Sequence, residues 1–137
     1  KKYIKLSKEI EFIKNYIELE KLRLEKNANV NLSVEGKSDT IEIAPMLFIP
    51  FVENSFKHGM KASVNSGFVN ILFRVEGNKL NFTISNNKPV LKEKSDESTK
   101  MGLENVHRRL DLLYDGKYKL TINEYDKEYK TELVIEI

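Results

Sequence analysis

The chain has 137 residues, with 23 Lys and Arg against 21 Asp and Glu, a net charge of +2 and no cysteine. This length predicts one domain with a substantial core, and the balanced charge gives no general attraction to nucleic acid or membrane surfaces. The lack of cysteine excludes disulfides, cysteine-bound zinc and thiol nucleophiles, and no apolar run approaches the roughly 20 residues of a membrane span.

Residues 6–26 form the first predicted element, a long charged helix. Ser7 is a suitable N-cap, and Glu9 lies in the first turn, where an acid is favourable. The helix has an apolar stripe and a second apolar group off it: Ile10, Ile13, Ile17 and Leu24 on the stripe, and Phe12, Leu19 and Leu22 off it. The second group leaves open a helix that also meets a partner helix, or a broad-faced surface helix. Since the chain starts without Met directly before this helix, we expect it to be a piece of a longer protein.

The next stretch predicts a strand, a turn and an extended approach to a second helix. Residues 30–34 alternate between polar and apolar, and residues 36–39 have the composition of a turn. Residues 40–43 are extended, because Pro45 biases the residue before it away from the helical region. Pro45 can then occupy the first position of the second helix.

Residues 51–59, Phe-Val-Glu-Asn-Ser-Phe-Lys-His-Gly, give the second helix two sharply different faces. One face is apolar and combines Phe48, Ile49, Val52, Ser55, Phe56, Gly59 and Met60. The other face carries Glu53, Asn54, Lys57 and His58. An acid, an amide, a cation and an imidazole within about one and a half turns are the mixture needed to hold a metal and a polyphosphate. An ordinary helix with a solvated polar face is the alternative interpretation.

Two alternating strands follow at residues 68–75 and 79–85, and Glu-Gly-Asn joins them as a hairpin. Their predicted inward residues are Val69, Ile71, Phe73 and Val75 in the first strand, and Leu80, Phe82 and Ile84 in the second. The pattern stops over residues 86–100. This segment is too long and too polar for a routine connection, so we expect either a disordered insertion or a functional lid.

Gly102 then opens a third helix that runs to about residue 114. Its predicted inward residues are Leu103, Val106, Leu110 and Leu113. Two final alternating strands occupy residues 118–124 and 131–137, joined across residues 125–130. Strands in hairpins with helices on one side predict an α+β fold, a two-layer α/β sandwich.

In this order, three motifs resemble the ATP-binding domain of the GHKL superfamily, the Bergerat fold, and most closely the LytS-type sensor histidine kinases. Residues 50–59 are similar to the family's N box, Pro-Phe/Leu-Val-Glu-Asn-Ala-x-Lys-His-Gly. Residues 100–110, Lys-Met-Gly-Leu-Glu-Asn-Val-His-Arg-Arg-Leu, resemble its G2 segment, Gly-x-Gly-Leu-x-Asn-x-x-x-Arg-Leu. The strand ending in Ile-Ser-Asn-Asn-Lys-Pro stands where the family has its G1 box.

The resemblance also implies an architecture. The family's sheet is mixed and mostly antiparallel, with about five strands covered on one face by about three helices. The leading helix resembles the segment that joins the phosphoacceptor helices to the ATP domain. We therefore expect a linker helix at residues 1–26 and an ATP-binding catalytic domain at residues 27–137.

The resemblance implies that the chain binds ATP and Mg²⁺. Asn54 would coordinate Mg²⁺, and Lys57 and His58 would face the phosphates. A surface histidine remains the alternative for His58. In the ATP-hydrolysing relatives a catalytic Glu stands one turn before the N-box Asn. Here that position is Pro50, which can activate no water, so fast hydrolysis is not expected.

The other implied contacts lie later in the chain. Gly102 and Leu103 would contact the phosphates, because a glycine at a helix start lets backbone N–H groups approach an anion. Asn86 would accept a hydrogen bond from the adenine amino group. The Thr131 hydroxyl would help to hold the adenine, unless Thr131 is an ordinary strand residue. The full set of implied nucleotide-binding residues is Asn54, Lys57, His58, Asn86, Met101, Gly102, Leu103, Asn105 and Thr131.

Three departures from the family pattern leave a second function open. Asn86, Asn87 and Lys88 replace the usual Asp-x-Gly, Lys100 replaces the first glycine of G2, and Lys130 replaces the glycine before the threonine. An Asn carbonyl can accept the adenine bond, but without the charge of a carboxylate. The alternative is a degenerate nucleotide-binding or pseudokinase interaction module without transfer activity.

A kinase of this family implies several partners. The chain would position Mg-ATP for transfer to a histidine outside it, since neither His58 nor His107 lies in a sequence resembling the acceptor motif. We expect phosphoacceptor helices of the same kinase, in cis or in trans, a cognate response regulator, and no nucleic acid. The parent protein would be a homodimeric bacterial sensor anchored in the membrane, with this domain in the cytoplasm.

Overall fold

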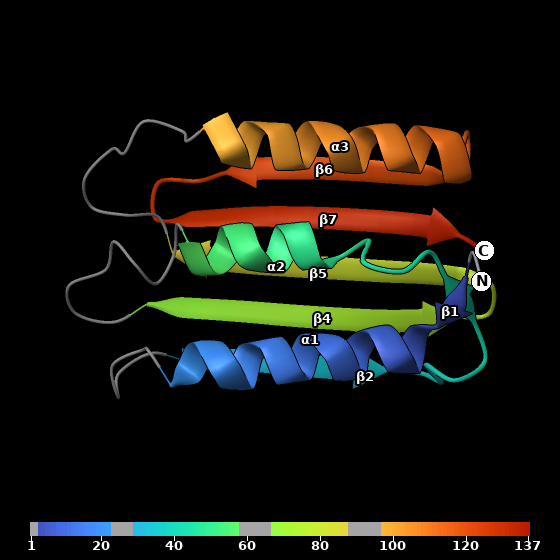
Figure 1. Cartoon of the computed structure of the whole chain (residues 1–137), viewed down its shortest axis with the longest axis horizontal. Coiled ribbons are helices and arrows are strands. Elements are labelled where there is room, and N and C mark those ends of the chain that lie inside the picture. Colours follow the sequence, from blue (N-terminus) through green and yellow to red (C-terminus); the bar gives the residue numbers. More distant parts are fainter. Residues whose placement is uncertain (1–2, 23–28, 58–66, 88–96) are drawn as a thin grey trace.

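The computed structural model describes residues 3–22, 29–57, 67–87 and 97–137, and side chains in the last range from residue 102 onward. In these ranges three helices lie on one face of a five-stranded sheet (Figure 1). The helices are α1 (Leu6–Lys21), α2 (Ile49–Ser55) and α3 (Glu97–Leu113). The strands of this sheet are β2 (Asn29–Glu35), β4 (Phe68–Glu76), β5 (Lys79–Asn87), β6 (Tyr118–Glu124) and β7 (Glu128–Glu136). The predicted α+β two-layer sandwich is confirmed.

The sheet has the strand order β2-β4-β5-β7-β6. The β2–β4 pair is parallel and the other pairs are antiparallel, so the sheet is mixed and mostly antiparallel, as expected. A separate short ribbon pairs β1 (Ile4–Lys5) with β3 (Glu42–Ile43). In Figure 1, α1 lies over the β2–β4 side, α3 over the β6–β7 side, and α2 between them over β5.

The core lies between the helices and the sheet. Because alternate strand residues share a face, the pairing of Phe73 with Phe82 and of Phe82 with Leu133 makes this face apolar across three strands. Phe48 packs on it, with ring centroids 5.2 Å from Phe73 and 4.7 Å from Phe82. The predicted inward residues of β4 and β5 are confirmed, since all of them belong to the core or pack against it.

The inner stripe of α1 is confirmed where the structure describes it. Ile10, Ile13 and Ile17 are buried, and Leu24 lies outside the described residues. The predicted N-cap is wrong: Lys5 holds that position, without a side-chain hydrogen bond, because β1 runs directly into the helix. Ser7 instead lies within the first turn, and its N–H donates to the Ser38 carbonyl at 2.9 Å.

The start of α2 differs from the prediction. Pro45 does not open this helix, which begins at Ile49 with Pro50 in its first turn. The residues between them form a turn in which Met46 has a left-handed φ of 61°. Pro45 and Pro50 are both suited to the first turn of a helix. Contacts from α1 and α3 keep Pro45 in the turn before the helix.

The start of α3 also differs. The helix begins at Glu97, so Gly102 lies inside it and the last part of the expected lid is helical. Residues 88–96 lie outside the described part of the chain. At the other end of α3, Leu113 is 38% exposed rather than inward, and Tyr114 is buried in its place. Tyr114 follows Leu110 by four residues, which brings both to the same side of the helix.

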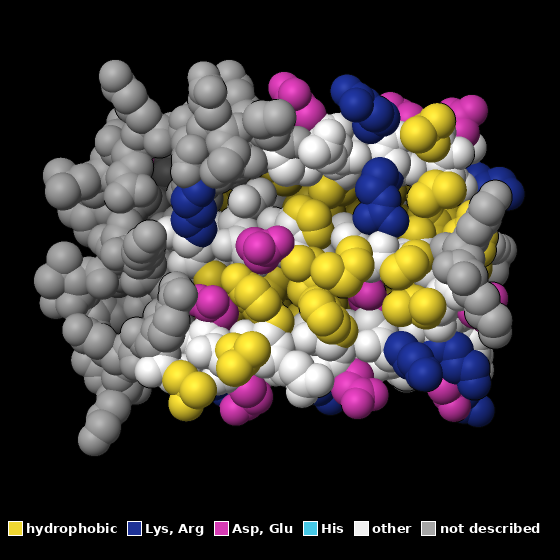
Figure 2. Space-filling model, in the orientation of Figure 1, with side chains coloured by type: hydrophobic (Ala, Val, Ile, Leu, Met, Phe, Trp, Pro, Cys, Tyr) yellow, Lys and Arg dark blue, Asp and Glu magenta, His cyan; other side chains and the backbone are white. Residues whose placement is uncertain are grey.

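The strands beside the expected lid are longer than predicted. β5 continues through Asn86 and Asn87, which pair with Tyr129 and Glu128 of β7. β7 consequently begins at Glu128, before the predicted start at residue 131. Seen from the helix side, apolar side chains gather over the middle of the molecule, with charged side chains mainly along its edges (Figure 2). No described helix is long and apolar enough to cross a membrane.

Candidate functional site

The predicted site residues come from elements that meet at one end of the sandwich. At this end α2 and β5 finish, and α3 and β7 begin (Figure 1). It brings together residues from separate motifs: Asn54 and Lys57 at the end of α2, Asn86 near the end of β5, Thr131 in β7, and Gly102, Leu103 and Asn105 in α3. His58 lies outside the described residues, and for Met101 only its backbone place in α3 is described.

The two-faced character of α2 is confirmed for its described residues. Ile49, Val52, Ser55 and Phe56 are buried, Glu53 is exposed, and Asn54 and Lys57 are half-buried. Phe51, which the sequence did not place on either face, is also buried.

Aromatic contacts hold α2 on both sides of Asn54. The Phe51 ring lies 5.9 Å from that of Phe82 in β5, and the Phe56 ring lies 5.9 Å from that of Tyr16 in α1, edge to face. Such pairs add to the burial energy and fix the orientation of the rings. The amide of Asn54 therefore projects from a helix that is anchored before and after it.

Buried polar side chains mark the site end of the sheet. Asn86 is 3% exposed and Thr131 is 4% exposed, on a face whose middle is apolar. Thr131 pairs with Ile84, so it is the diagonal neighbour of Asn86 on the helix-facing side. The Asn86 amide donates to the Asn87 carbonyl at 2.9 Å, and the Asn87 side-chain oxygen accepts the Phe68 N–H at 2.8 Å. Strand pairing thus brings together two residues that the motifs place far apart.

Tyr129 is a site-end residue that the sequence did not predict. It lies directly opposite Asn86 and two residues before Thr131, so the three share the helix-facing side. Burial raises the pKa of the Tyr129 phenol, and the nearby negative charge of Glu124 raises it further. The alternation of β7, extended backwards by one step, is the signal that would have found it.

Gly102 does not lie at the start of a helix, as the sequence predicted. It lies inside α3, and a Cβ added there would meet no heavy atom within 4 Å. Neither packing nor the helix start therefore requires glycine here, although glycine destabilises a helix interior by about 1 kcal/mol relative to alanine. Leu103 packs against the core and Asn105 is exposed.

Glu9 is a second residue whose role the sequence missed. The sequence placed it only as a favourable acid in the first turn of α1, and the structure shows that it is 1% exposed. Its Oε1 accepts the Met46 N–H at 3.1 Å, and the N–H groups of Leu47 and Phe48 also favour its charged form. Burial has the larger effect and raises the pKa of this carboxyl above its usual value, while Arg109 acts in the opposite direction.

The loop before α2 is also held from α3. Arg109 donates from Nη2 to the Pro45 carbonyl at 2.7 Å and from Nη1 to the Met46 carbonyl at 3.2 Å. The Tyr114 hydroxyl accepts the Ala44 N–H at 3.0 Å. Residues of the helices on both sides therefore bind the backbone that leads into the site helix.

The residues present are compatible with a magnesium ion held mainly by a substrate. The described residues contain no group of three or more His, Cys, Asp or Glu side chains that could hold a metal. Mg²⁺ commonly takes one or two protein oxygens and completes its shell with phosphate oxygens and water. The half-buried amide of Asn54 offers one such oxygen at the site end.

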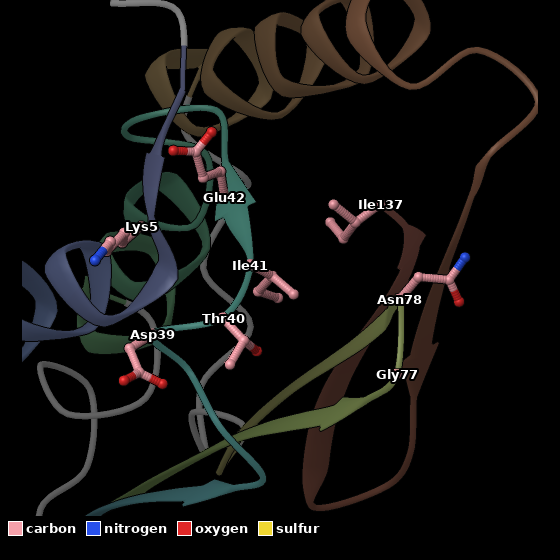
Figure 3. Close-up of a pocket in the computed structure, with 8 residues that line it drawn as sticks. All are labelled: Lys5, Asp39, Thr40, Ile41, Glu42, Gly77, Asn78 and Ile137. Carbon is pink, nitrogen blue, oxygen red and sulfur yellow. The ribbon is translucent and has the colours of Figure 1, made fainter.

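A cavity of about 600 Å³ lies at the opposite end of the molecule. In Figure 3 its lining comes from the β1–β3 ribbon, from the residues just before β3, from the β4–β5 turn and from the residue that follows β7. The lining residues are Lys5, Asp39, Thr40, Ile41, Glu42, Gly77, Asn78 and Ile137. None of them belongs to the predicted site, so the cavity is separate from it.

Several known proteins similar to this chain are sensor kinases, although no protein-family model matches it. The chain is 27% identical over 120 residues to the sensor histidine kinase BtsS of Escherichia coli, covering 88% of this chain and 21% of BtsS. It is 24% identical over 145 residues to the sensor protein LytS of Oceanobacillus iheyensis, covering 96% of this chain and 25% of LytS. The chain thus spans a quarter or less of the length of these relatives.

Solved structures with a similar fold are also histidine kinases. The catalytic domain of the histidine kinase ThkA superposes with a TM-score of 0.69 at 15% identity, covering 98% of this chain and 95% of that domain. ThkA in complex with the response regulator protein TrrA gives a TM-score of 0.67 at 14% identity, covering 98% of this chain and 41% of the solved one. The resemblance found in the sequence is confirmed: the homologues of this chain are sensor histidine kinases, LytS among them, and its fold is that of their catalytic domain.

Proposed function

We propose that this chain is the ATP-binding catalytic domain of a two-component sensor histidine kinase, and that it positions Mg-ATP for transfer of the γ-phosphoryl group to a histidine outside the chain. The observation that carries the proposal is the pair of buried polar side chains, Asn86 and Thr131, at the end of the apolar core where Asn54 lies. Apolar side chains would fill these two positions without the cost of removing a polar group from water, so packing does not account for their polarity.

The proposed roles follow from the chemistry of each group. One amide hydrogen of Asn86 is bonded to the Asn87 carbonyl, which orients the side chain and leaves its oxygen as the acceptor for the adenine amino group. The Thr131 hydroxyl would complete the adenine contact. Asn54 would give Mg²⁺ an amide oxygen, and Lys57 and His58 would neutralise phosphate charge. A bound Mg²⁺ would offset the negative charge that develops on the phosphoryl group during transfer.

Phosphoryl transfer of this kind needs positioning and charge neutralisation more than covalent chemistry from the protein. The nucleophile would be a histidine on phosphoacceptor helices of the same kinase, reached in cis or in trans, with residues 1–26 as the linker to them and residues 27–137 as the catalytic domain. A cognate response regulator would then receive the group, in line with the complex formed by ThkA. The parent protein would be a homodimeric sensor anchored in a bacterial membrane, with this domain in the cytoplasm.

A degenerate nucleotide-binding or pseudokinase module is the second candidate. Asn86 to Lys88, Lys100 and Lys130 replace residues that the family uses at the nucleotide, and these replacements favour it. ATP hydrolysis by the domain itself is disfavoured, because Pro50 occupies the first turn of α2, where the hydrolysing relatives have a glutamate.

Calorimetric titration with a non-hydrolysable ATP analogue, with and without Mg²⁺, tests nucleotide binding. We expect Mg²⁺-dependent binding that Asn54→Ala weakens at least about tenfold, the loss of roughly one charge-assisted contact. Asn15→Ala makes the same change at an exposed position of α1, outside the predicted site; it is the matched control and should bind as the unaltered chain does. No binding up to millimolar nucleotide would contradict the proposal.

A transfer assay separates the kinase from the pseudokinase. The phosphoacceptor helices of the parent protein are added to the chain together with labelled ATP. A kinase gives acid-labile label on the added helices, because phosphohistidine hydrolyses in acid. Binding of nucleotide without any such label would favour the pseudokinase module.

A further inference from the structure

The loop of residues 44–48 leads directly into α2, the helix that carries Asn54. The Phe48 carbonyl accepts the N–H groups of Phe51 and Val52 at 3.1 and 3.2 Å, so the end of the loop is also the first hydrogen-bonded carbonyl of α2. α2 has only seven residues and no side-chain cap. A helix this short has little stability of its own, and its place therefore depends on what holds its ends.

The loop presents its peptide groups in two directions. Met46 has a φ of 61°, in the left-handed region that side chains other than glycine seldom adopt. On one side, N–H groups of the loop face the Glu9 carboxylate of α1, with the Met46 N–H at 3.1 Å from Oε1. On the other side, carbonyls of the loop accept the two donors of the Arg109 fork from α3. The turn is thus bound from both neighbouring helices.

Burial of Glu9 has a cost that packing does not offset. A carboxylate taken out of water destabilises the fold unless its oxygens are well bonded, and Oε2 has no hydrogen-bond partner among the described residues. An apolar side chain of similar size would fill the same space without that cost. What the carboxylate adds is hydrogen bonding to successive backbone N–H groups of the loop, which only a hydrogen-bond acceptor can provide.

We propose that Glu9 and Arg109 are positioning residues for the nucleotide site. Glu9 from α1 and Arg109 from α3 bind the backbone of the loop before α2 and thereby fix the place of Asn54. The inference rests on the proposed function. Asn54 lies on the same short helix as the end of the loop, so a shift of the loop shifts its amide. Metal and phosphate contacts tolerate displacements of only about 0.5 Å, so a loosened loop weakens the Mg²⁺-dependent part of binding.

The test compares three variants in two assays. Glu9→Gln keeps the shape of the side chain and removes its charge, and Arg109→Lys keeps the charge and removes the two-donor fork. Glu11→Gln makes the same change as Glu9→Gln at an exposed position of α1 and is the control. Calorimetry measures the affinity for a non-hydrolysable ATP analogue, with Mg²⁺ and with EDTA. Amide hydrogen exchange by NMR measures protection at Met46, Leu47 and Phe48.

We expect Glu9→Gln and Arg109→Lys to weaken Mg²⁺-dependent binding about five- to twentyfold, with a change below about twofold in EDTA. The three loop amides should exchange faster in both variants. Glu11→Gln should match the unaltered chain in both assays. Arg109 lies on α3 and Glu9 on α1, so Arg109→Lys still tests the positioning role if Glu9→Gln does not fold.

Several results would overturn the inference. Faster exchange of the loop amides with unchanged Mg²⁺-dependent affinity would mean that the contacts are structural only. An equal loss of affinity with Mg²⁺ and with EDTA would indicate general destabilisation. If the unaltered chain binds no nucleotide, the proposed function fails and the positioning role fails with it, whereas normal binding by the unaltered chain and by both variants sinks the positioning role alone.

Discussion

The inner face of the sheet has two regions of opposite character. In its middle, Phe73, Phe82 and Leu133 pair across three strands and are almost fully buried. At the end where α2 finishes, Asn86 and Thr131 are buried as deeply but are polar. Packing accounts for the first region, because each ring there removes apolar surface from water. It does not account for the second, and positions where burial and polarity conflict are where a function is expected.

The largest effect on stability is predicted in the middle region. Phe82→Ala should lower the free energy of unfolding by about 3–5 kcal/mol, since it removes a ring that contacts Phe48, Phe51 and Phe73 and leaves a cavity. Urea denaturation measures the change. Thr83→Ala, the next residue on the opposite face of the sheet, is the control. A loss below about 1 kcal/mol for Phe82→Ala would mean that this region is not the core.

At the polar end the effect should move from stability to binding. Thr131→Val keeps the side-chain shape and removes the hydroxyl, so nucleotide affinity should fall about tenfold, the value of one hydrogen bond. The free energy of unfolding should change by less than about 1 kcal/mol. Thr121→Val, on β6 and directed away from the helices, is the control for both measurements. Unchanged affinity together with a large loss of stability would make Thr131 an ordinary strand residue.

Gly102 sharpens the same contrast between packing and function. Gly102→Ala should raise the free energy of unfolding by about 1 kcal/mol, because the glycine lies inside α3 with open space around the position of a Cβ. If the backbone at this point contacts the phosphates, as the family resemblance implies, nucleotide affinity should fall in the same variant. Glu104→Ala, at an exposed position of α3, is the control. A variant that is more stable and binds equally well would remove Gly102 from the site.

The smallest effect is predicted for the titration of Glu9, a buried acid outside both regions. Burial raises its pKa in the folded chain above the value of about 4.3 expected in the unfolded chain, so between these two values the folded chain holds more protons. The contribution of Glu9 to the free energy of unfolding is therefore fully present below about pH 4, and it is lost as the pH rises through the pKa of the folded chain.

Urea denaturation from pH 4 to 7.5 measures this dependence. The free energy of unfolding of the unaltered chain minus that of Glu9→Gln should fall as the pH rises from 4. A difference that rises with pH would show that the pKa is lowered, and would mean that the backbone N–H groups and Arg109 outweigh burial.

Much of the fold could be predicted from local patterns. The alternation of β4 and β5 fixed their inner faces, because the side-chain period of a strand depends only on the strand itself. The start of α2 could not be predicted in this way. Pro45 and Pro50 both suit the first turn of a helix, and the choice between them depends on contacts that Glu9 and Arg109 make from distant parts of the chain.

The candidate site shows the same division. The motif on α2 predicts Asn54 as a site residue, and the family pattern predicts Asn86 and Thr131. Their nearness to each other, and the place of Tyr129 beside them, follows from strand pairing that no single segment specifies. The polar run of residues 86–100 predicted a disordered insertion or a functional lid, whereas residues 97–100 are helical.

NMR mapping of a Mg²⁺ and ATP-analogue titration tests the contrast between the two ends of the molecule most directly. We predict that backbone amide shifts change at Asn54, Asn86 and Thr131, and that the amides of Gly77 and Asn78, which line the cavity at the opposite end, do not move. Shifts centred on Gly77 and Asn78, with the polar end unaffected, would contradict the account.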